Sequence, residues 1–426
     1  MTRPYNVFVM GLNDFHRREM ECIHDADRFR FHALFEEDEV VHRRDYAREM
    51  LAEAEGRLRA FDGPIDGLFG LMDFPVTAMV PLLCRRFALP GPDPRSVLHC
   101  THKYWSRVAQ RELVPECTPL FQWIDPFEPH AARQINLPFP FWLEPVKSYA
   151  SHLGFRIDDR PALEQALEQI RDEIHTIGDA FDELMDEVAL PAHLRCVHGD
   201  CCVAKELVGG RELVPEGYVF HGEIGIQGLI AVPRRLGGFD RHQYPAEVDP
   251  ALARRIGDAT RRLMGGIAYD DGCFNVEFLH DDATNKLWVF EVNPSISQSH
   301  SWFFEKVDGV SNHDTAVHVA VGERPPRTSG EGVWKVAAKC LHRSWKNGVV
   351  ERVPDRRALE QIERDFPDCL VHLTVEEGTH LDGPLAQDGD SNVLAEICVC
   401  GTDAADLDRR REAIADRLDI RIAPPG

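Results

Sequence analysis

The sequence lacks long apolar runs and is short of basic residues. No stretch of ~18 apolar residues occurs, and the first twenty residues have neither the basic start nor the apolar core of a signal peptide, so we expect a cytoplasmic protein with no membrane partner. Acidic side chains number 71 against 48 basic ones, for a formal net charge of -23. Such a surface repels phosphate backbones, which argues against nucleic acid as a partner.

Motifs for zinc, disulfides and dinucleotides are also missing. The 12 cysteines include the adjacent pair Cys201 and Cys202 and the close pair Cys398 and Cys400, but there is no CxxC spacing and no matching histidine pair. We therefore expect reduced thiols in the core. The "GLNDF" that follows the first apolar run is not a GxGxxG fingerprint.

What is present is the composition of a folded protein with more than one core. The chain has 426 residues, of which 43% are hydrophobic and 28% charged. At ~150 residues per domain, this length predicts two to four domains or subdomains.

The first 95 residues read as alternating strands and helices. "NVFVMGL", "FRFHALF" and "IDGLFGLMDF" are strand candidates, and apolar residues at three- and four-residue steps predict a helix over 41–61. This order favours an open parallel sheet, similar to half of a Rossmann fold. The proline- and glycine-rich segment 88–96 is the predicted end of this unit.

Further along the chain, helices are predicted from Ser96, over 161–190 and over 251–266. The segment 322–332 is a predicted linker to a tail of alternating strands and helices. The second of these helices carries an apolar stripe formed by Leu163, Leu167, Ile170, Ile174, Ile177, Phe181, Leu184 and Val188.

The stretch 274–297 predicts a hairpin with acids on one face, because side chains alternate along a strand. In the first strand, one face holds Phe274, Val276 and Phe278, and the other holds Asn275 and Glu277. In the second strand, one face holds Trp288, Phe290 and Val292, and the other holds Val289, Glu291 and Asn293.

If the two strands pair, Glu277 and Glu291 approach each other on one side of the sheet. Two close carboxylates repel unless a proton or a cation lies between them. Carboxylates and an Asn carbonyl are ligands that Mg²⁺ accepts, and Mg²⁺ completes its shell with water and substrate phosphates. The alternative interpretation is an ordinary hairpin with one solvated, acidic face.

The order of these landmarks over residues 1–325 resembles the ATP-grasp carboxylate-amine ligases, the superfamily that includes biotin carboxylase. The resemblance implies ATP and Mg²⁺ as cofactors. It assigns the metal ligands to Glu277 in "FNVEF" and to Glu291 and Asn293 in "FEVNP".

The same resemblance implies a phosphate-contacting lysine, Lys103, and a lid over about 137–208 whose moving loop spans 148–154. The lid departs from the family pattern in two ways. Glu144 stands where a lysine is usual, and Gly154 is the only obvious glycine of the loop. Lys147 is the expected replacement cation for ATP binding and catalysis.

The segment after the lid resembles the hinge that receives adenine and ribose. The implied contacts are Lys205, Glu206, Leu207 and Val208, with Glu212 or Glu216 near the ribose. The alternative for this segment alone is a plain hairpin with charged edges.

Ser295 stands where the family commonly has an arginine that stabilises the phosphoryl group during its transfer. A serine lacks the charge and the bidentate geometry of a guanidinium. Arg211 or Lys147 is therefore expected to contribute charge beside Ser295 if phosphoryl transfer occurs.

The small polar residues that follow lie where the family binds its carboxylate or amine substrate. Ser297, Ser299 and His300 are the expected substrate contacts, with Gln298 between them. The alternative for His300 is a satisfied structural histidine.

Together these observations predict an α/β (α+β) protein with an ATP-grasp fold. The expected domains are a Rossmann-like pre-ATP-grasp domain (1–95), an ATP-grasp domain (96–325) and a small C-terminal α+β domain (333–426). The implied function is an ATP-dependent ligase that joins a small carboxylate to an amine, amino acids among them, through an acyl phosphate. The alternatives are a nucleotide-binding protein with impaired transfer chemistry and a carboxylase-like enzyme that activates bicarbonate. A homodimer is the assembly to test.

Overall fold

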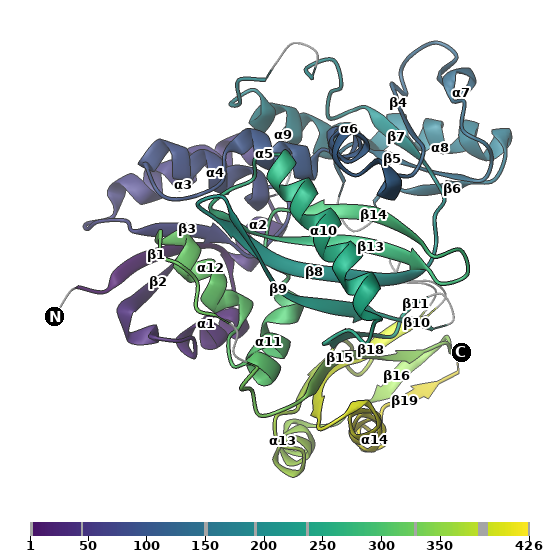
Figure 1. The fold of residues 1–426 in the computed structure, drawn as a ribbon. Helices are drawn as coiled ribbons and strands as arrows, with labels where there is room; N and C mark the ends of the chain where they lie inside the picture. Colours follow the sequence, from purple (N-terminus) through teal and green to yellow (C-terminus); the bar gives the residue numbers. More distant parts are fainter. Residues whose placement is uncertain are drawn as a thin grey trace.

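The structure is a computed structural model and describes residues 3–43, 46–148, 152–190, 194–235, 238–327, 330–381 and 391–424. Over these ranges it forms an N-terminal unit, a small four-stranded sheet that includes much of the predicted lid and is called the lid below, a central sheet and a C-terminal unit (Figure 1). The described helices include none that combines the length and apolarity needed to span a bilayer. All twelve cysteines lie in the described ranges and are free thiols.

The N-terminal unit contains the expected parallel sheet. Its strands β1 (Tyr5–Leu12), β2 (Phe29–Glu36) and β3 (Gly67–Gly70) run in the order β2-β1-β3. The helices of this unit are α1 (Asp14–Glu21), α2 (Glu37–Val41), α3 (Ala47–Ala60) and α4 (Val76–Phe87). The helix predicted over 41–61 is thus shorter than expected, because α2 ends at Val41 and α3 begins at Ala47.

The lid is a four-stranded sheet in the order β4-β7-β5-β6. Its strands are β4 (Phe121–Ile124), β5 (Phe141–Pro145), β6 (Phe155–Ile157) and β7 (Cys202–Glu206), with the short helix α7 (Ala131–Gln134) after β4. Strand β4 precedes the segment 137–208 that we expected for the lid. Four residues are too few to show a period, so the sequence carried little signal for it.

The long apolar stripe of 161–190 belongs to two helices, α8 (Arg160–Glu173) and α9 (His175–Met185). The side chains from Leu163 to Ile174 join the lid core, whereas those from Ile177 to Val188 join the core of the N-terminal unit. One amphipathic stripe therefore connects the lid to the first unit.

The central sheet has eight strands in the order β14-β13-β8-β9-β12-β15-β18-β17. These are β8 (Arg211–Phe220), β9 (Glu223–Val232), β12 (Arg241–Tyr244), β13 (Gly272–Asp281), β14 (Lys286–Asn293), β15 (Val336–Ser344), β17 (Leu370–Leu373) and β18 (Asn392–Gly401). The helices packed around it are α5 (Pro94–Thr101), α6 (Lys103–Leu113), α10 (Pro250–Gly266), α11 (Ser301–Asp308) and α12 (Asn312–Ala320).

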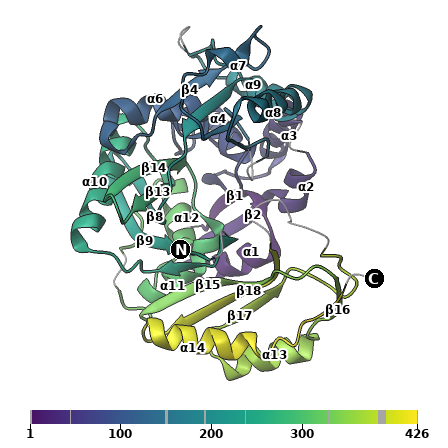
Figure 2. The same cartoon turned by 90° about the vertical axis from the view of Figure 1, so that its right-hand side faces the viewer.

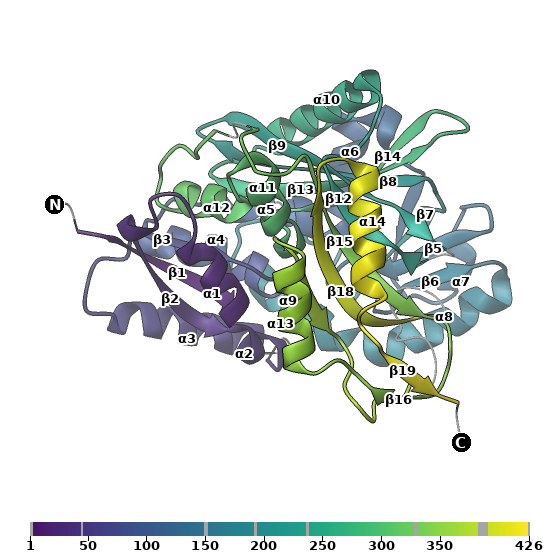
Figure 3. The same ribbon diagram turned by 90° about the horizontal axis from the view of Figure 1, so that it is seen from below.

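The C-terminal unit shares this sheet, because β12 pairs with β15 in antiparallel register. Helices α13 (Arg356–Asp365) and α14 (Ala404–Ala415) cover the outer face of its strands (Figures 2 and 3). The small strands β10 (Arg234–Arg235) and β11 (Gly238–Phe239) form one pair, and β16 (Val349–Arg352) and β19 (Arg421–Ala423) form another. The linker composition had given no sign of this continuous sheet.

The predicted hairpin is present as β13 and β14, but one detail of its alternation was wrong. Glu277 lies opposite Glu291, and the next pair is Phe278 with Val289, so Phe290 is left over as a bulge. Val289 consequently points into the core with Val292, and Phe290 shares the opposite face with Glu291. A strict period of two cannot anticipate an inserted residue.

Phe278 is fully buried in the core beneath this hairpin. The variant Phe278→Ala should lower the free energy of unfolding by about 3–5 kcal/mol, because it removes packing and leaves a cavity. Urea denaturation would measure the loss. The control Phe139→Ala, at a position that is 43% exposed, should change stability far less; equal losses in the two variants would contradict this packing role.

Candidate active site

A cavity of about 770 Å³ lies where the lid, the β13–β14 hairpin and the carboxyl edge of the N-terminal sheet meet. Ligands of open α/β sheets bind at this edge, because the loops there carry freely varying side chains. The charged lining residues are Glu37, Asp73, Lys103, Arg107, Glu144, Lys205, Glu206, Glu277 and Glu291. Its size lies within the range of small-molecule binding pockets.

The lid presents a charged face to this cavity. Trp142 pairs with Lys205, and Glu144 pairs with Val203, so Trp142, Glu144 and Lys205 share one side of the lid sheet. The residues between them, Leu143 and Ala204, are buried against α8 on the other side. Ordinary strand alternation thus places an acid and a lysine above the cavity.

Two lysines pair with Glu144, and Arg107 lies near enough for its charge to act on it. Lys205 Nζ lies 2.5 Å from Glu144 Oε1, and Lys103 Nζ lies 3.5 Å from Glu144 Oε2 and 3.0 Å from Glu291 Oε1. Arg107, one turn after Lys103 on α6, donates to the carbonyls of Val289 and Phe290, each at 2.6 Å. The cluster joins α6, the lid and β14.

The pKa values of this cluster follow from burial and mutual charge. Burial would raise the pKa of Glu144, but the charges of Lys103 and Lys205 outweigh it and lower the pKa to about 2. Burial lowers the pKa of Arg107 to about 10 and also lowers that of Lys205. The pKa of Lys103 is raised, since Glu144 and Glu291 outweigh its desolvation. At neutral pH, Glu144 is therefore an ionised acid among cations.

Glu277 and Glu291 oppose each other at the end of the hairpin, as the spacing predicted. Asn293 Nδ2 donates to Glu277 Oε1 at 3.1 Å and to Asn275 Oδ1 at 2.9 Å. Burial and the nearby charges of Glu291 and Glu212 raise the pKa of Glu277 to about 8. The pair therefore needs a proton or a cation to be stable in the folded protein.

These residues suit a Mg²⁺ ion that takes most of its ligands from elsewhere. Among the described residues no group of three or more His, Cys, Asp and Glu side chains forms a complete cation site. Two carboxylates and the Asn293 carbonyl oxygen are the hard donors that Mg²⁺ accepts alongside phosphate and water. Lys103, bound to Glu291, supplies the positive charge in this structure.

Lys147, a predicted catalytic and ATP-binding residue, does not itself line the cavity but pairs with a residue that does. Its side chain is only 5% exposed, and its Nζ is 3.2 Å from Oδ1 of Asp73, which lines the cavity at the end of β3. Ser148 lines the cavity too, but residues 149–151 of the predicted moving loop lie outside the described residues.

Arg211, the other cation predicted to assist catalysis, is placed elsewhere. It opens β8 opposite His280, and its guanidinium pairs with Asp282 at 3.1 Å, beyond the lining of the cavity. The prediction failed because Arg211 is three pairs further along the sheet than Glu277, on the far side of the bulge. We leave it out of the site.

The predicted hinge lies at the cavity, with Glu206, Leu207 and Val208 lining it beside Lys205. Glu206 is tied to the start of β4, because its backbone NH donates to Leu120 O and its carboxylate accepts from Leu120 N. The two ribose candidates are both buried, Glu212 being 7% and Glu216 1% exposed, and neither lines the cavity.

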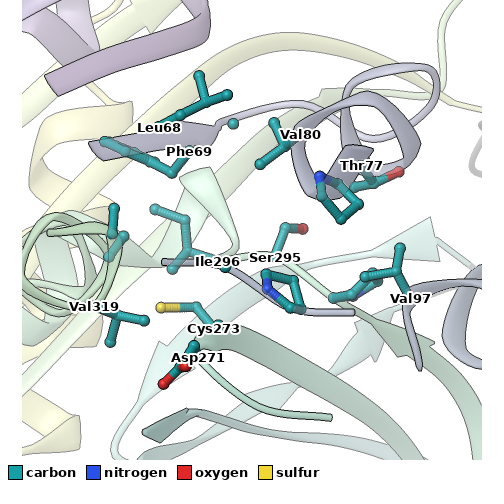
Figure 4. Close-up of a pocket in the computed structure, with 18 of the residues that line it drawn as sticks. Leu68, Phe69, Thr77, Val80, Val97, Asp271, Cys273, Ser295, Ile296 and Val319 are labelled. Atoms are coloured by element: carbon teal, nitrogen blue, oxygen red, sulfur yellow. The ribbon is translucent and has the colours of Figure 1, made fainter. Parts of the chain in front are cut away.

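Ser295 forms part of the wall between the main cavity and a second one of about 70 Å³. Figure 4 shows that apolar side chains such as Leu68, Val80 and Val319 surround this smaller space, with Ile296 among them. The wall behind Ser295 therefore supplies no positive charge in place of the expected arginine.

The predicted substrate residues divide into two groups. Ser297 and Ser299 line the cavity with Gln298, whereas His300 is 3% exposed and lies behind them. His300 Nδ1 and Glu216 Oε2 are 2.7 Å apart, and Glu216 Oε1 accepts from the backbone NH of Ser297 at 3.0 Å. This geometry favours the alternative interpretation of His300 as a structural histidine whose hydrogen bonds are satisfied.

Several lining residues were not assigned to the site by the sequence analysis. Arg107 could have been found from its four-residue spacing after Lys103, which puts both on one helix face. Asn275 alternates with Glu277 on β13. Glu37 and Asp73 follow different strands of the N-terminal sheet, and no local pattern links them to the hairpin.

Residues 245–327, which include the hairpin, match the family model described as "Carbamoyl-phosphate synthase L chain, ATP binding domain". A comparison with curated proteins found no matching sequence. The family match therefore covers the segment that holds Glu277, Glu291 and Asn293.

Solved structures resemble the whole chain. An L-amino acid ligase from Bacillus licheniformis has a TM-score of 0.71 at 15% identity, over 99% of this chain and 100% of that one. Phosphoribosylglycinamide synthetase from Anaerococcus prevotii has 0.65 at 12%, over 99% and 100%. A biotin carboxylase complex with β-γ-ATP from Campylobacter jejuni has 0.62 at 13%, over 98% and 92%. The expected ATP-grasp fold is confirmed.

The raised pKa of Glu277 predicts how stability depends on pH. The unfolded chain ionises Glu277 near 4.5, whereas the metal-free folded protein keeps its proton up to about pH 8. This group should therefore make stability fall as pH rises between these two values, because the folded state holds the extra proton. Urea melts in EDTA should show the fall in the parent protein and a smaller one in Glu277→Gln; identical profiles would contradict the assignment.

Glu216 should hold the segment 297–300 in place. In Glu216→Gln we expect a loss of about 1–3 kcal/mol in unfolding free energy, because buried partners lose a charged acceptor. Amide exchange of Ser297 should become faster in this variant. Glu223→Gln, at an exposed ion pair with Arg324, is the control; unchanged exchange in Glu216→Gln would refute the role.

Proposed function

We propose that this chain is an ATP-dependent ligase that joins a carboxylate to an amine, with Mg²⁺·ATP bound in the cavity of about 770 Å³. The observation that carries the proposal is the meeting of opposite charges there. A paired set of acids, Glu277 and Glu291, faces the cations Lys103, Arg107 and Lys205 within an ATP-grasp fold. Metal-bound polyphosphate is the ligand whose charges match both sets.

Each part of the cavity has a role in this proposal. Lys103, Arg107 and Lys205 attract phosphate oxygens, and Glu206, Leu207 and Val208 receive the adenosine. Glu277, Glu291 and Asn293 would hold Mg²⁺, which supplies neutralisation of phosphate charge during transfer. The lid excludes water from the reactive acyl phosphate.

The proposed reaction has two steps. The carboxylate attacks the γ-phosphorus of ATP, giving an acyl phosphate and ADP. The neutral amine then attacks the acyl carbon, phosphate leaves, and the amine nitrogen loses a proton to give the amide. Ser297, Gln298 and Ser299 lie at the substrate end of the cavity, where their polar groups would orient the two reactants.

A nucleotide-binding protein with weakened transfer chemistry is the second candidate. It is favoured by Ser295, which replaces the arginine expected at that position and has no basic side chain among the described residues that line the smaller cavity behind it, and by the acid Glu144 among the phosphate-facing cations. ATP binding without ADP release is the result that would distinguish this candidate from a ligase.

The direct test is ADP release with Mg²⁺·ATP against amino acids, other small carboxylic acids, amines and bicarbonate, with thermal shifts recorded alongside. ADP release that requires both a carboxylate and an amine supports the ligase. Release with bicarbonate alone would favour a carboxylase-like enzyme. A thermal shift without ADP release favours the second candidate. The absence of both the thermal shift and ADP release would refute nucleotide binding.

Two variants should separate metal binding from phosphate binding. Glu291→Gln should abolish Mg²⁺-dependent turnover, and Lys103→Met should weaken ATP binding about 10- to 100-fold, the value of one charge-assisted contact. Turnover and isothermal titration would measure these effects. Asp282→Asn, on the same hairpin but paired with Arg211 outside the cavity, should behave as the parent.

A further inference from the structure

Glu144 is buried, with 6% of its surface exposed, at a point where cations converge from two elements. Lys103 comes from the first turn of α6, and Lys205 comes from the neighbouring lid strand β7. Lys205 Nζ is 2.5 Å and Lys103 Nζ is 3.5 Å from its carboxylate oxygens. Both lysines also line the cavity.

Without Glu144 these cations would repel one another in a site of low dielectric. Lys103 has a second acid, Glu291, at 3.0 Å, but Glu144 is the only acid for which the structure records an ion pair with Lys205 among the described residues. Arg107 brings a third positive charge whose hydrogen bonds go to neutral groups, the carbonyls of Val289 and Phe290 and the side-chain amide of Gln110. Buried like charges destabilise the folded protein when they are unpaired.

An anion already occupies the place where these cations converge. A polyphosphate in the cavity would compete with Glu144 for Lys103 and Lys205, and Glu144 would repel it at short range. Glu144 therefore stabilises the empty site and weakens the filled one. These two effects have opposite signs, which distinguishes this role from that of an ordinary structural acid.

We propose that Glu144 is a built-in counter-anion that positions Lys103 and Lys205 and competes with the phosphates for them. The proposal rests on the function proposed above, because it takes the cavity to bind a polyphosphate. Glu144 is a positioning residue: it acts through the two lysines. Its effect is to lower nucleotide affinity in exchange for a stable, ordered site before the nucleotide arrives.

The test compares Glu144→Gln with the parent protein by isothermal titration of inorganic tripolyphosphate and of Mg²⁺·ADP, together with thermal melts of the free protein. We expect tripolyphosphate and Mg²⁺·ADP each to bind about tenfold tighter or more, since a nearby like charge is removed. The melting temperature of the free variant should fall. A purely structural role would lower stability and weaken binding together.

A matched control and a second pair of variants protect this test. Asp158→Asn removes a lid acid paired with Arg156 at 2.9 Å, both side chains being 60% exposed, and should leave binding unchanged. If Glu144→Gln does not fold, Lys205→Met is compared with the double variant Lys205→Met/Glu144→Gln. The double variant leaves one fewer cation without its acid than Glu144→Gln does, because Lys205 is also removed. The double variant should bind tripolyphosphate more tightly than Lys205→Met alone.

The outcomes separate this proposal from the function. Equal or weaker binding in the variants that lack Glu144, with ATP binding intact in the parent, would overturn the counter-anion and leave the ligase standing. Tighter tripolyphosphate binding in those variants with no ADP release in any protein would support the counter-anion and count against the ligase. Absence of polyphosphate binding in every protein would overturn both.

Discussion

The contact between the Lys103 ammonium and the Glu291 carboxylate is the interaction around which the site is built. It joins the start of α6 to the end of β14, and Glu144 extends it to the lid. The charges of these acids and cations thus balance one another in the wall of a cavity, and not within a filled interface. Because the compensation is shared, a ligand that brings both a metal and phosphates can replace it charge for charge.

The fold provides the separation that such a site requires. The paired acids sit on the central sheet, where the register of β13 and β14 places Glu277 opposite Glu291. Cations sit on α6 and on the lid. The lid core and the N-terminal core are linked by α8 and α9, whose shared stripe changes partner at Ile174. The α8–α9 junction is thus one of the places where the lid joins the rest of the chain, together with the connections before β4 and after β7.

The segment 297–299, the proposed substrate end of the cavity, is supported from three directions. Glu216 on β8 holds the backbone of Ser297, His16 on α1 contacts Gln298, and Lys339 on β15 reaches Ser299. Because β15 belongs to the same sheet as β13, the C-terminal unit contributes to this end of the cavity. The segment 297–299 is thus ordered by tertiary contacts before any substrate is bound.

The sequence by itself determined the parts of this protein that depend on local periodicity. The hairpin, the opposition of its two acids, the parallel N-terminal sheet and the lysine at the start of α6 all follow from alternation, helical spacing and turn residues. The resemblance built on those motifs predicted the ATP-grasp fold correctly.

Only the tertiary structure decided which distant charges meet: Glu144 with Lys103 and Lys205, Asp73 with Lys147, and Arg211 with Asp282 outside the cavity. It also decided the bulge at Phe290 and the burial of His300 on Glu216. The physical reason is that alternation and spacing act within a few residues, whereas charge pairing acts across space between elements whose relative placement is set by packing of whole cores.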